Sequence, residues 1–362
     1  MKNRWRYLQQ VAQGLIIAGL AGILSSCGGT FQQTFYGVTS LVSDGSVTAN
    51  HLDANLKNGW GIAFNPKGVV WVADNGSSVS TLYDGNGVPQ PLVVAIPAGS
   101  AGPAAPTGVV FNPSNDFVVT KGALSGKSAF LFVGEAGTVS GWSPTVNASN
   151  AVTAVDAGAS GAVYKGLALA SFGGANYLYA ANFAAQSIDV YNGSFAKVTL
   201  PGAFIDPHLP ANYAPFNVAT NAGLIYVAYA HVTPPGTDED EGAGLGIVSL
   251  FDTGGNFIRR LVTGGALNAP WGMAFAPADF SGFPNAILIG NFGDGTINAY
   301  DATTGGYLGP LMSAAHTPLV VHGLWGIGFG NDLDSQPHNT LFFAAGPNHE
   351  AGGQYGRIDA QP

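Results

Sequence analysis

One stretch decides the fold: Asn58-Gly59-Trp60-Gly61-Ile62-Ala63-Phe64-Asn65-Pro66, followed after a turn by Val69-Val70-Trp71-Val72-Ala73. A similar stretch returns as Ala269-Pro270-Trp271-Gly272-Met273-Ala274-Phe275, and again as Gly323-Leu324-Trp325-Gly326-Ile327-Gly328-Phe329. Each copy places a short strand of small residues before a tight turn and a second strand of β-branched and aromatic residues. Self-similarity of this kind is the signature of a repeat architecture.

Weaker copies of the same stretch fill the interval between the strong ones. We call the first bulky position of each copy its anchor. The anchors are Trp60, Thr107, Lys165 or Gly166, Phe216, Trp271 and Trp325. They lie about 53 residues apart, which is typical of a four-stranded propeller blade with generous loops. The prediction is an all-β, six-bladed β-propeller; five or seven blades would follow if a weak copy had been merged or split.

The two ends of the repeat predict how the ring closes. Residues 355–359 read as the third strand of the last blade, and residues 35–43 form a strand that precedes blade one and has no blade of its own. We expect residues 35–43 to supply the outer strand of the last blade. This arrangement joins both ends of the chain and removes exposed sheet edges.

The N-terminus reads as an export signal. Lys2, Arg4 and Arg6 precede an apolar stretch over residues 11–24, which is the length of a signal sequence and too short to span a bilayer. It ends Leu24-Ser25-Ser26-Cys27, which resembles a bacterial lipobox. The predicted organisation is a signal peptide (1–26), a tether (27–34) and the propeller (35–362), with lipid on Cys27 holding the exported protein at the cell envelope. The alternative is an ordinary signal peptide with a coincidental cysteine.

Composition limits the partners that the propeller can have. Charged residues make up 9% of the chain and the net charge is −9. No run of Lys or Arg follows the extreme N-terminus, which argues against a nucleic-acid partner. Contact with a membrane is expected through the lipid alone.

Polar residues follow the second strand of several blades, where they would surround one mouth of the channel. They are Asn75, Glu135, Asn182 and Asn291. One carboxylate among amide oxygens is a ligand set that suits Ca²⁺ or Mg²⁺, and it is similar to the metal sites of lactonase propellers. The alternative is that these residues cap and turn their loops.

Two further groups of residues are candidates for function. The acidic run Asp238-Glu239-Asp240-Glu241 is an insertion in blade four, either a solvated loop or a lid that binds a cation. His231, His349 and Glu350 follow second strands and could form an acid–base pair at the same mouth. The three anchor tryptophans read as core residues, with an exposed sugar-stacking platform as the alternative.

Several of these motifs resemble an uncharacterised family of exported bacterial proteins with NHL-like repeats. The resemblance rests on residues 58–63, the acidic insertion near residues 238–242, residues 291–301 and residues 345–351. It covers nearly the whole mature chain and implies an NHL-like propeller, but no activity. The sequence departs from the family pattern at residues 232–236 and at His349, where an acid is expected.

Two functions therefore stay open at the level of sequence. The first is a binding scaffold that engages a protein or a glycan through one face of the propeller. The second is a metal-dependent hydrolase of lactonase type, built on Asn75, Glu135, Asn182 and Asn291. The second rests on analogy between folds, which is a weak basis for assigning function.

Overall fold

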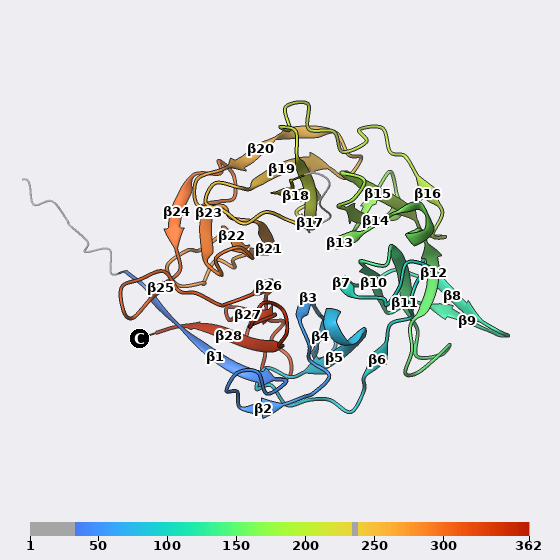
Figure 1. The fold of residues 1–362 in the computed structure, drawn as a ribbon, viewed down its shortest axis with the longest axis horizontal. Coiled ribbons are helices and arrows are strands. Elements are labelled where there is room, and N and C mark those ends of the chain that lie inside the picture. Colours follow the sequence, from blue (N-terminus) through green and yellow to red (C-terminus); the bar gives the residue numbers. More distant parts are fainter. Residues whose placement is uncertain (1–32, 234–237, 362) are drawn as a thin grey trace, which may run out of the picture. The chain divides into compact units, whose positions relative to one another are not determined.

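The structure is a computed structural model that describes residues 33–233 and 238–361. The signal peptide, most of the tether and Cys27 lie outside these residues. Thr34–Pro362 form one compact unit, in which six sheets surround a central channel (Figure 1). Within the described ranges, no helix is long and apolar enough to cross a membrane.

The first three blades follow one another along the chain. Blade 1 contains β3 (Gly59–Phe64), β4 (Val70–Asp74), β5 (Val79–Tyr83) and β6 (Val94–Ala95), with the short 3₁₀ helix η1 (Asn75–Ser77). Blade 2 contains β7 (Pro106–Phe111), β10 (Phe130–Gly134), β11 (Thr138–Trp142) and β12 (Val152–Asp156), followed by η2 (Gly158–Ser160). Blade 3 contains β13 (Tyr164–Phe172), β14 (Ala175–Asn182), β15 (Ser187–Asn192) and β16 (Lys197–Val198). A hairpin that the repeat did not predict, β8 (Val118–Lys121) with β9 (Leu124–Lys127), is inserted in blade 2.

The other three blades complete the ring. Blade 4 contains β17 (Tyr213–Asn221), β18 (Leu224–His231), β19 (Ile247–Asp252) and β20 (Phe257–Thr263). Blade 5 contains β21 (Pro270–Phe275), β22 (Ala286–Asn291), β23 (Ile297–Asp301) and β24 (Tyr307–Pro310). Blade 6 contains β26 (Leu324–Phe329), β27 (Leu341–Ala345), β28 (Gln354–Ala360) and β1 (Phe35–Ser43), to which β2 (His51–Leu52) and β25 (Met312–Ser313) add short parallel pairings. The prediction of six four-stranded blades is confirmed.

The predicted closure of the ring is also confirmed. β1 pairs antiparallel with β28, with Val38 opposite Ile358, so both ends of the chain share one blade. The innermost strands of neighbouring blades contact one another around the whole ring, including β26 with β3. The last blade therefore joins the first.

Glycine explains how closely the inner strands approach. The residue after the anchor is Gly61, Gly108, Gly166, Gly272 and Gly326 in five blades. A Cβ on Gly61 would lie 2.6 Å from the carbonyl oxygen of Thr107 in the next blade. Blade 4 has Asn217 at this position, and its Nδ2 donates instead to the carbonyl oxygen of Trp271 in blade 5, at 2.8 Å. Equivalent positions therefore lie level with one another, so all six inner strands run in the same direction along the channel.

Candidate functional site: the channel mouth

Four anchors form what we call the aromatic layer across the channel: Trp60, Phe216, Trp271 and Trp325. Trp60 stacks on Trp325 with ring centroids 3.5 Å apart, and Trp271 meets both edge-on at 5.9 and 5.8 Å. The three indoles are 2%, 4% and 0% exposed, so they are core residues and offer no platform for a sugar. The layer separates one end of the channel from the other. We call the end at which the inner strands begin the mouth.

Lys165, the anchor of blade 3, brings a charge into this apolar setting. The residue is 2% exposed, and its Nζ lies between 5.2 and 5.7 Å from the ring centroids of Trp60, Phe183 and Phe216. The same ammonium lies 3.1 Å from Asp238, 3.1 Å from Glu239 and 3.4 Å from Glu135. Burial opposes the charge on Lys165, but the three carboxylates outweigh it and raise the pKa of the ammonium group. Lys165 is therefore a protonated lysine held in a cage of rings and carboxylates.

The acidic run of blade 4 folds over the mouth and contacts this cage. Glu239 is 6% exposed on its side chain, while Asp238 keeps 83% of its side chain in solvent. Burial raises the pKa of Glu239, against the lowering effect of Lys165. Asp240 turns the other way and accepts a hydrogen bond at 2.7 Å from Thr233. The run is thus more than a solvated loop, and the cation it contacts is the chain's own lysine.

A line of hydrogen bonds connects the carboxylates on either side of Trp60. Asn75 donates from Nδ2 to Glu135 Oε2 at 3.0 Å. Asn58 donates from Nδ2 to Glu350 Oε2 at 2.7 Å, and its Oδ1 accepts from the indole of Trp325 at 3.1 Å. Asn58 also approaches Asn75 Oδ1 at 3.4 Å. These amides fix the positions of two carboxylates that face the mouth.

The four residues expected to bind Ca²⁺ or Mg²⁺ do not form one site. Asn75 and Glu135 are in contact, as described above. The oxygen of Asn182 accepts from the backbone amides of Val163 and Ala185. The oxygen of Asn291 accepts from the backbone amide of Asn268. The amide oxygens of Asn182 and Asn291 are thus engaged by backbone amides of their own blades and are not directed at one point with Asn75 and Glu135.

A different kind of metal site would be built from His, Cys, Asp and Glu, whereas the predicted set has one carboxylate and three amides. Among residues 33–233 and 238–361, no three His, Cys, Asp or Glu side chains are placed to hold a metal ion. The carboxylates of Glu135, Asp238 and Glu239 instead surround the ammonium group of Lys165.

Three residues were expected to supply an acid–base pair, and the structure separates His231 from the other two. His231 Nδ1 lies 2.7 Å from Asp240 Oδ2, and its ring meets Tyr213 edge-on, outside the cavity at the mouth. His349 and Glu350 both line that cavity. Asn348, His349 and Glu350 have φ angles of 58°, 54° and 64°, so this turn is left-handed over three consecutive non-glycine residues. Such backbone strain is concentrated at functional sites.

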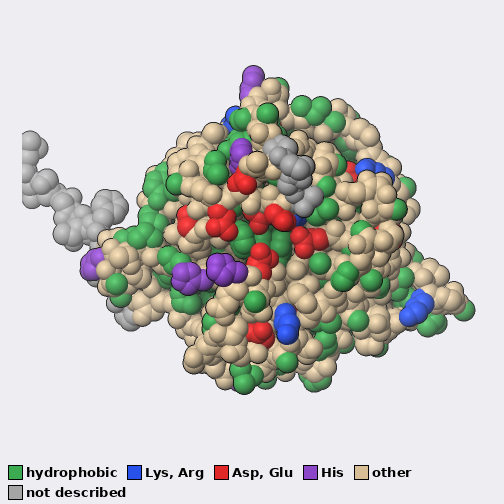
Figure 2. Space-filling model, in the orientation of Figure 1, with side chains coloured by type: hydrophobic (Ala, Val, Ile, Leu, Met, Phe, Trp, Pro, Cys, Tyr) green, Lys and Arg blue, Asp and Glu red, His purple; other side chains and the backbone are tan. Residues whose placement is uncertain are grey.

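The cavity at the mouth has a volume of about 390 Å³. Its lining is Trp60, Glu135, Lys165, Asp238, Glu239, Glu241, Phe292, His349 and Glu350. A neighbouring cavity of about 580 Å³ shares Glu241, His349 and Glu350 and adds Asp294 and His322. Figure 2 shows the acidic side chains gathered at the centre of this face, with histidines beside them. The surroundings raise the pKa of Glu350, mainly through burial and further through the carboxylates of Glu135 and Asp238, against the lowering effects of Asn58 and Lys165.

Sequence reasoning missed two of the residues that build the site. Lys165 was treated only as an anchor, although a lysine at a position that is aromatic in four other blades was a signal in itself. Asn58 stood in the stretch that decided the fold, but nothing in its type or spacing distinguishes a bridging amide from a turn residue.

Comparison with other proteins finds relatives that are themselves uncharacterised. No family model matches the sequence. Uncharacterized protein L690 of Acanthamoeba polyphaga mimivirus is 32% identical over 336 residues, which cover 89% of this chain and 85% of the relative. Uncharacterized protein R648 of the same virus is 31% identical over 353 residues, covering 94% and 84%.

Solved structures support the fold alone. A protein of unknown function from Bacteroides thetaiotaomicron aligns with a TM-score of 0.55 at 12% identity, covering 90% of this chain and 77% of that one. A glucose dehydrogenase aligns with a TM-score of 0.50 at 13% identity, covering 90% and 100%. At such identities only the propeller architecture carries over. From the sequence comparison, the chain belongs to the same protein family as L690 and R648 of Acanthamoeba polyphaga mimivirus.

Proposed function

We propose that this chain is an exported binding protein, attached to the cell envelope through lipid on Cys27, whose channel mouth binds a basic segment of a partner protein. One observation carries the proposal for the mouth. Five carboxylates line a single cavity that contains one lysine, and that lysine is already surrounded by three of them. The excess of negative charge at the centre of this face attracts a cationic ligand.

The placement of the carboxylates suits side chains that enter from outside. Glu241 is exposed and lines both neighbouring cavities. Glu350 is half-buried beside it and held by Asn58. A partner's arginine can pair with such carboxylates through two parallel hydrogen bonds, and a lysine can pair as a point charge. The strained turn that carries Glu350 keeps its carboxylate fixed before binding, which lowers the entropic cost of binding.

A neutral glycan fits this mouth less well than a basic peptide. Sugars stack on exposed rings, whereas the indoles of the aromatic layer are buried. A neutral ligand would also cover carboxylates without pairing them, and an unpaired buried charge is costly. The metal-dependent hydrolase needs Asn182 and Asn291 as ligands, and the amide oxygens of both accept hydrogen bonds from the backbone. Binding of a basic segment is therefore the function that the geometry supports best.

The experiment uses the compact unit Thr34–Pro362. Fluorescence anisotropy is measured with a labelled peptide of alternating Lys, Arg and Gly, and with a neutral peptide of the same length. We expect saturable binding of the basic peptide alone, weakened by added salt. Glu241→Gln should weaken it several-fold. The matched control is Asp334→Asn, since Asp334 is an exposed acid on the loop between β26 and β27, at the opposite end of the channel.

Three outcomes would contradict the proposal. The first is equal binding of both peptides. The second is an equal effect of the Glu241 and Asp334 substitutions. The third is binding of neutral oligosaccharides in preference to the basic peptide, which would assign the face to a glycan.

A further inference from the structure

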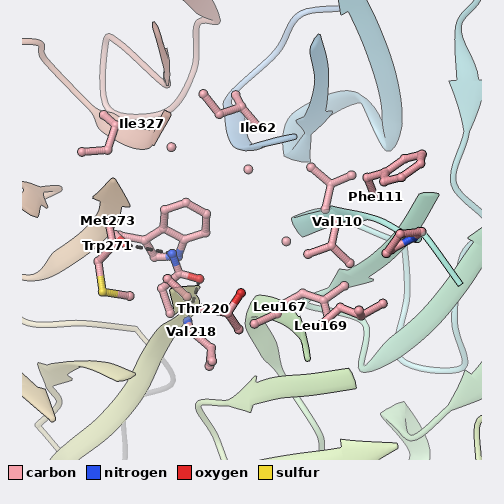
Figure 3. A pocket seen from close by; sticks show the side chains of 18 residues that line it. Ile62, Val110, Phe111, Leu167, Leu169, Val218, Thr220, Trp271, Met273 and Ile327 are labelled. Atoms are coloured by element: carbon pink, nitrogen blue, oxygen red, sulfur yellow. Dashed lines mark hydrogen bonds between the residues drawn. The ribbon is translucent and has the colours of Figure 1, made fainter. Parts of the chain in front are cut away.

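The channel holds a second cavity at the end opposite the mouth, which we call the apolar funnel. Its volume is about 390 Å³. It is lined along the inner strands and just beyond their ends, including Ile62, Val110, Phe111, Leu169 and Met273. Figure 3 shows the lining residues arranged around one space, with Val218 and Ile327 adding the two remaining blades. Trp271, from the aromatic layer, lies at its inner end, so the funnel is closed toward the mouth.

The repeat itself builds the wall of the funnel. At each anchor the inner strand has one extra residue relative to the second strand, and the residue two positions after each anchor then lines the funnel. These residues are Ile62, Val109, Leu167, Val218, Met273 and Ile327. All six are apolar and all six line the funnel. The anchors include tryptophan and lysine, so the channel is not uniformly apolar at the level of the anchors.

The polar groups inside the funnel are occupied. Asn217 donates to the carbonyl oxygen of Trp271 at 2.8 Å, and its own Oδ1 accepts from the amide of Val218 at 2.8 Å. The indole Nε1 of Trp271 donates to the carbonyl oxygen of Lys165 at 2.8 Å. None of the residues that line the funnel, all within the described ranges, is Asp, Glu, Lys, Arg or His. Only Thr220, which is exposed, brings a hydroxyl group to the rim.

We infer that the apolar funnel is a binding site for one small, uncharged apolar molecule, such as a compound with two or three aromatic rings. Its volume is within the range of pockets that bind small molecules. Ile62, Val110, Phe111 and Leu169 are only half-buried, so a ligand would remove apolar surface from water. A charged ligand would lose its water and find no side chain of opposite charge in this wall. Met273 adds a flexible thioether that can adapt to an aromatic ring.

This inference is independent of the function proposed for the mouth. The two cavities lie on opposite sides of the aromatic layer and differ in charge: five carboxylates line one and no charged group lines the other. Binding at the funnel should not depend on salt or on Glu241. The two proposals can therefore fail separately.

The test titrates N-phenyl-1-naphthylamine, an uncharged probe that fluoresces in apolar surroundings, into Thr34–Pro362. We expect saturable binding of one probe per chain, unchanged by added salt and by Glu241→Gln. Val110→Trp fills the funnel and should weaken binding at least tenfold. Val118→Trp is the matched control, because Val118 is 48% exposed on β8 and does not line the funnel.

The controls keep the inference falsifiable. Unlabelled naphthalene should displace the probe, whereas naphthalene sulfonate should not. If Val110→Trp does not fold, Leu169→Asn, which adds a polar group to the half-buried wall, is used with the same criterion. Unsaturable fluorescence, or equal affinity in the funnel and β8 variants, would overturn the inference.

Discussion

The ammonium of Lys165 lies 3.1 Å from the carboxylate of Glu239, although the two residues are far apart in sequence. Lys165 stands on the inner strand β13, and Glu239 stands in the acidic run that follows β18. Both are almost fully buried, at 2% and 6% exposure. A charged pair at this depth is expensive to break, because either partner alone would be left in a poorly solvated site. The pair therefore fixes the acidic run at the mouth.

Lys165→Met tests the strength of this arrangement. Methionine keeps the length and the contact with the rings but removes the charge, which leaves Glu239 buried without a partner. We expect the free energy of unfolding, measured by urea denaturation, to fall by about 3 kcal/mol. Lys197→Met is the control, because Lys197 is 60% exposed and its buried partner Asp189 keeps hydrogen bonds from Tyr164 and Asn182 when the lysine is removed. It should cost less than about 1 kcal/mol.

The double variant Lys165→Met with Glu239→Gln distinguishes loss of this ion pair from general destabilisation of the fold. Removing the second charge should recover part of the loss, because the unpaired carboxylate is then absent. If the double variant is as unstable as the sum of both single variants, the two residues do not act as a pair.

Much of the fold could be predicted because the repeated residues stand at positions where close contacts allow few types of side chain. In five blades a glycine follows the anchor where the inner strands touch, so it marks those copies in the sequence. Closure of the ring by residues 35–43 could be predicted because this strand precedes the first copy and has no blade of its own. The hairpin of β8 and β9 could not be foreseen, since it is an insertion with no counterpart in the other blades.

The site was harder to predict, because it depends on where side chains turn after their strands end. Asn182 pairs opposite the residue before its anchor, as Asp74 does in blade 1, so Asn75 stands one residue further along. Asn75 reaches Glu135 in the next blade, whereas Asn182 caps its own loop. Amide side chains serve both roles, and the loop that follows decides between them. The contact of Glu239 with Lys165 depends on the path of an insertion, which periodicity does not describe.

Glu350 gives the fold a pH dependence that can be measured. Its pKa is raised above the ordinary value of 4.5, chiefly by burial. A carboxyl group with a higher pKa in the folded state binds its proton more tightly there than in the unfolded chain. Its stabilising contribution is complete below 4.5 and is lost as the pH rises through the raised value.

Glu350→Gln should therefore gain stability relative to the wild type as the pH rises from about 4 to about 7. Urea unfolding of both proteins across this range measures the difference. Parallel curves would mean that the environment of Glu350 does not favour its protonated form.

The left-handed turn at the mouth predicts a substitution that stabilises the protein. His349 has a φ of 54°, which costs a residue with a Cβ about 1–2 kcal/mol. Glycine adopts this conformation freely but loses about 0.5–1 kcal/mol of entropy on folding. His349→Gly should thus raise the free energy of unfolding by about 0.5–1 kcal/mol. The exposed His322, which lacks a positive φ, is the control, and His322→Gly should lower it.

Cys27→Ser tests the anchor, which rests on the sequence Leu24-Ser25-Ser26-Cys27 alone. With lipid on Cys27, the protein should sediment with membranes and dissolve in detergent. The serine variant cannot be acylated at this position and should be recovered in the soluble fraction. Recovery of the variant with membranes would show that another feature holds the protein there.

Gly326→Ala tests the steric rule that closes the ring. A Cβ at this position would collide with the backbone oxygen of Trp60 and lie 3.2 Å from the amide of Ile62, so the first and last blades would have to separate. We expect a loss of about 2 kcal/mol in the free energy of unfolding. Gly68→Ala is the control, because only side-chain atoms at 3.6 and 3.8 Å face its Cβ, and it should change stability by less than about 0.5 kcal/mol. Equal effects at both positions would mean that the inner strands can move apart without cost, and the absence of a side chain after the anchor would then need another explanation.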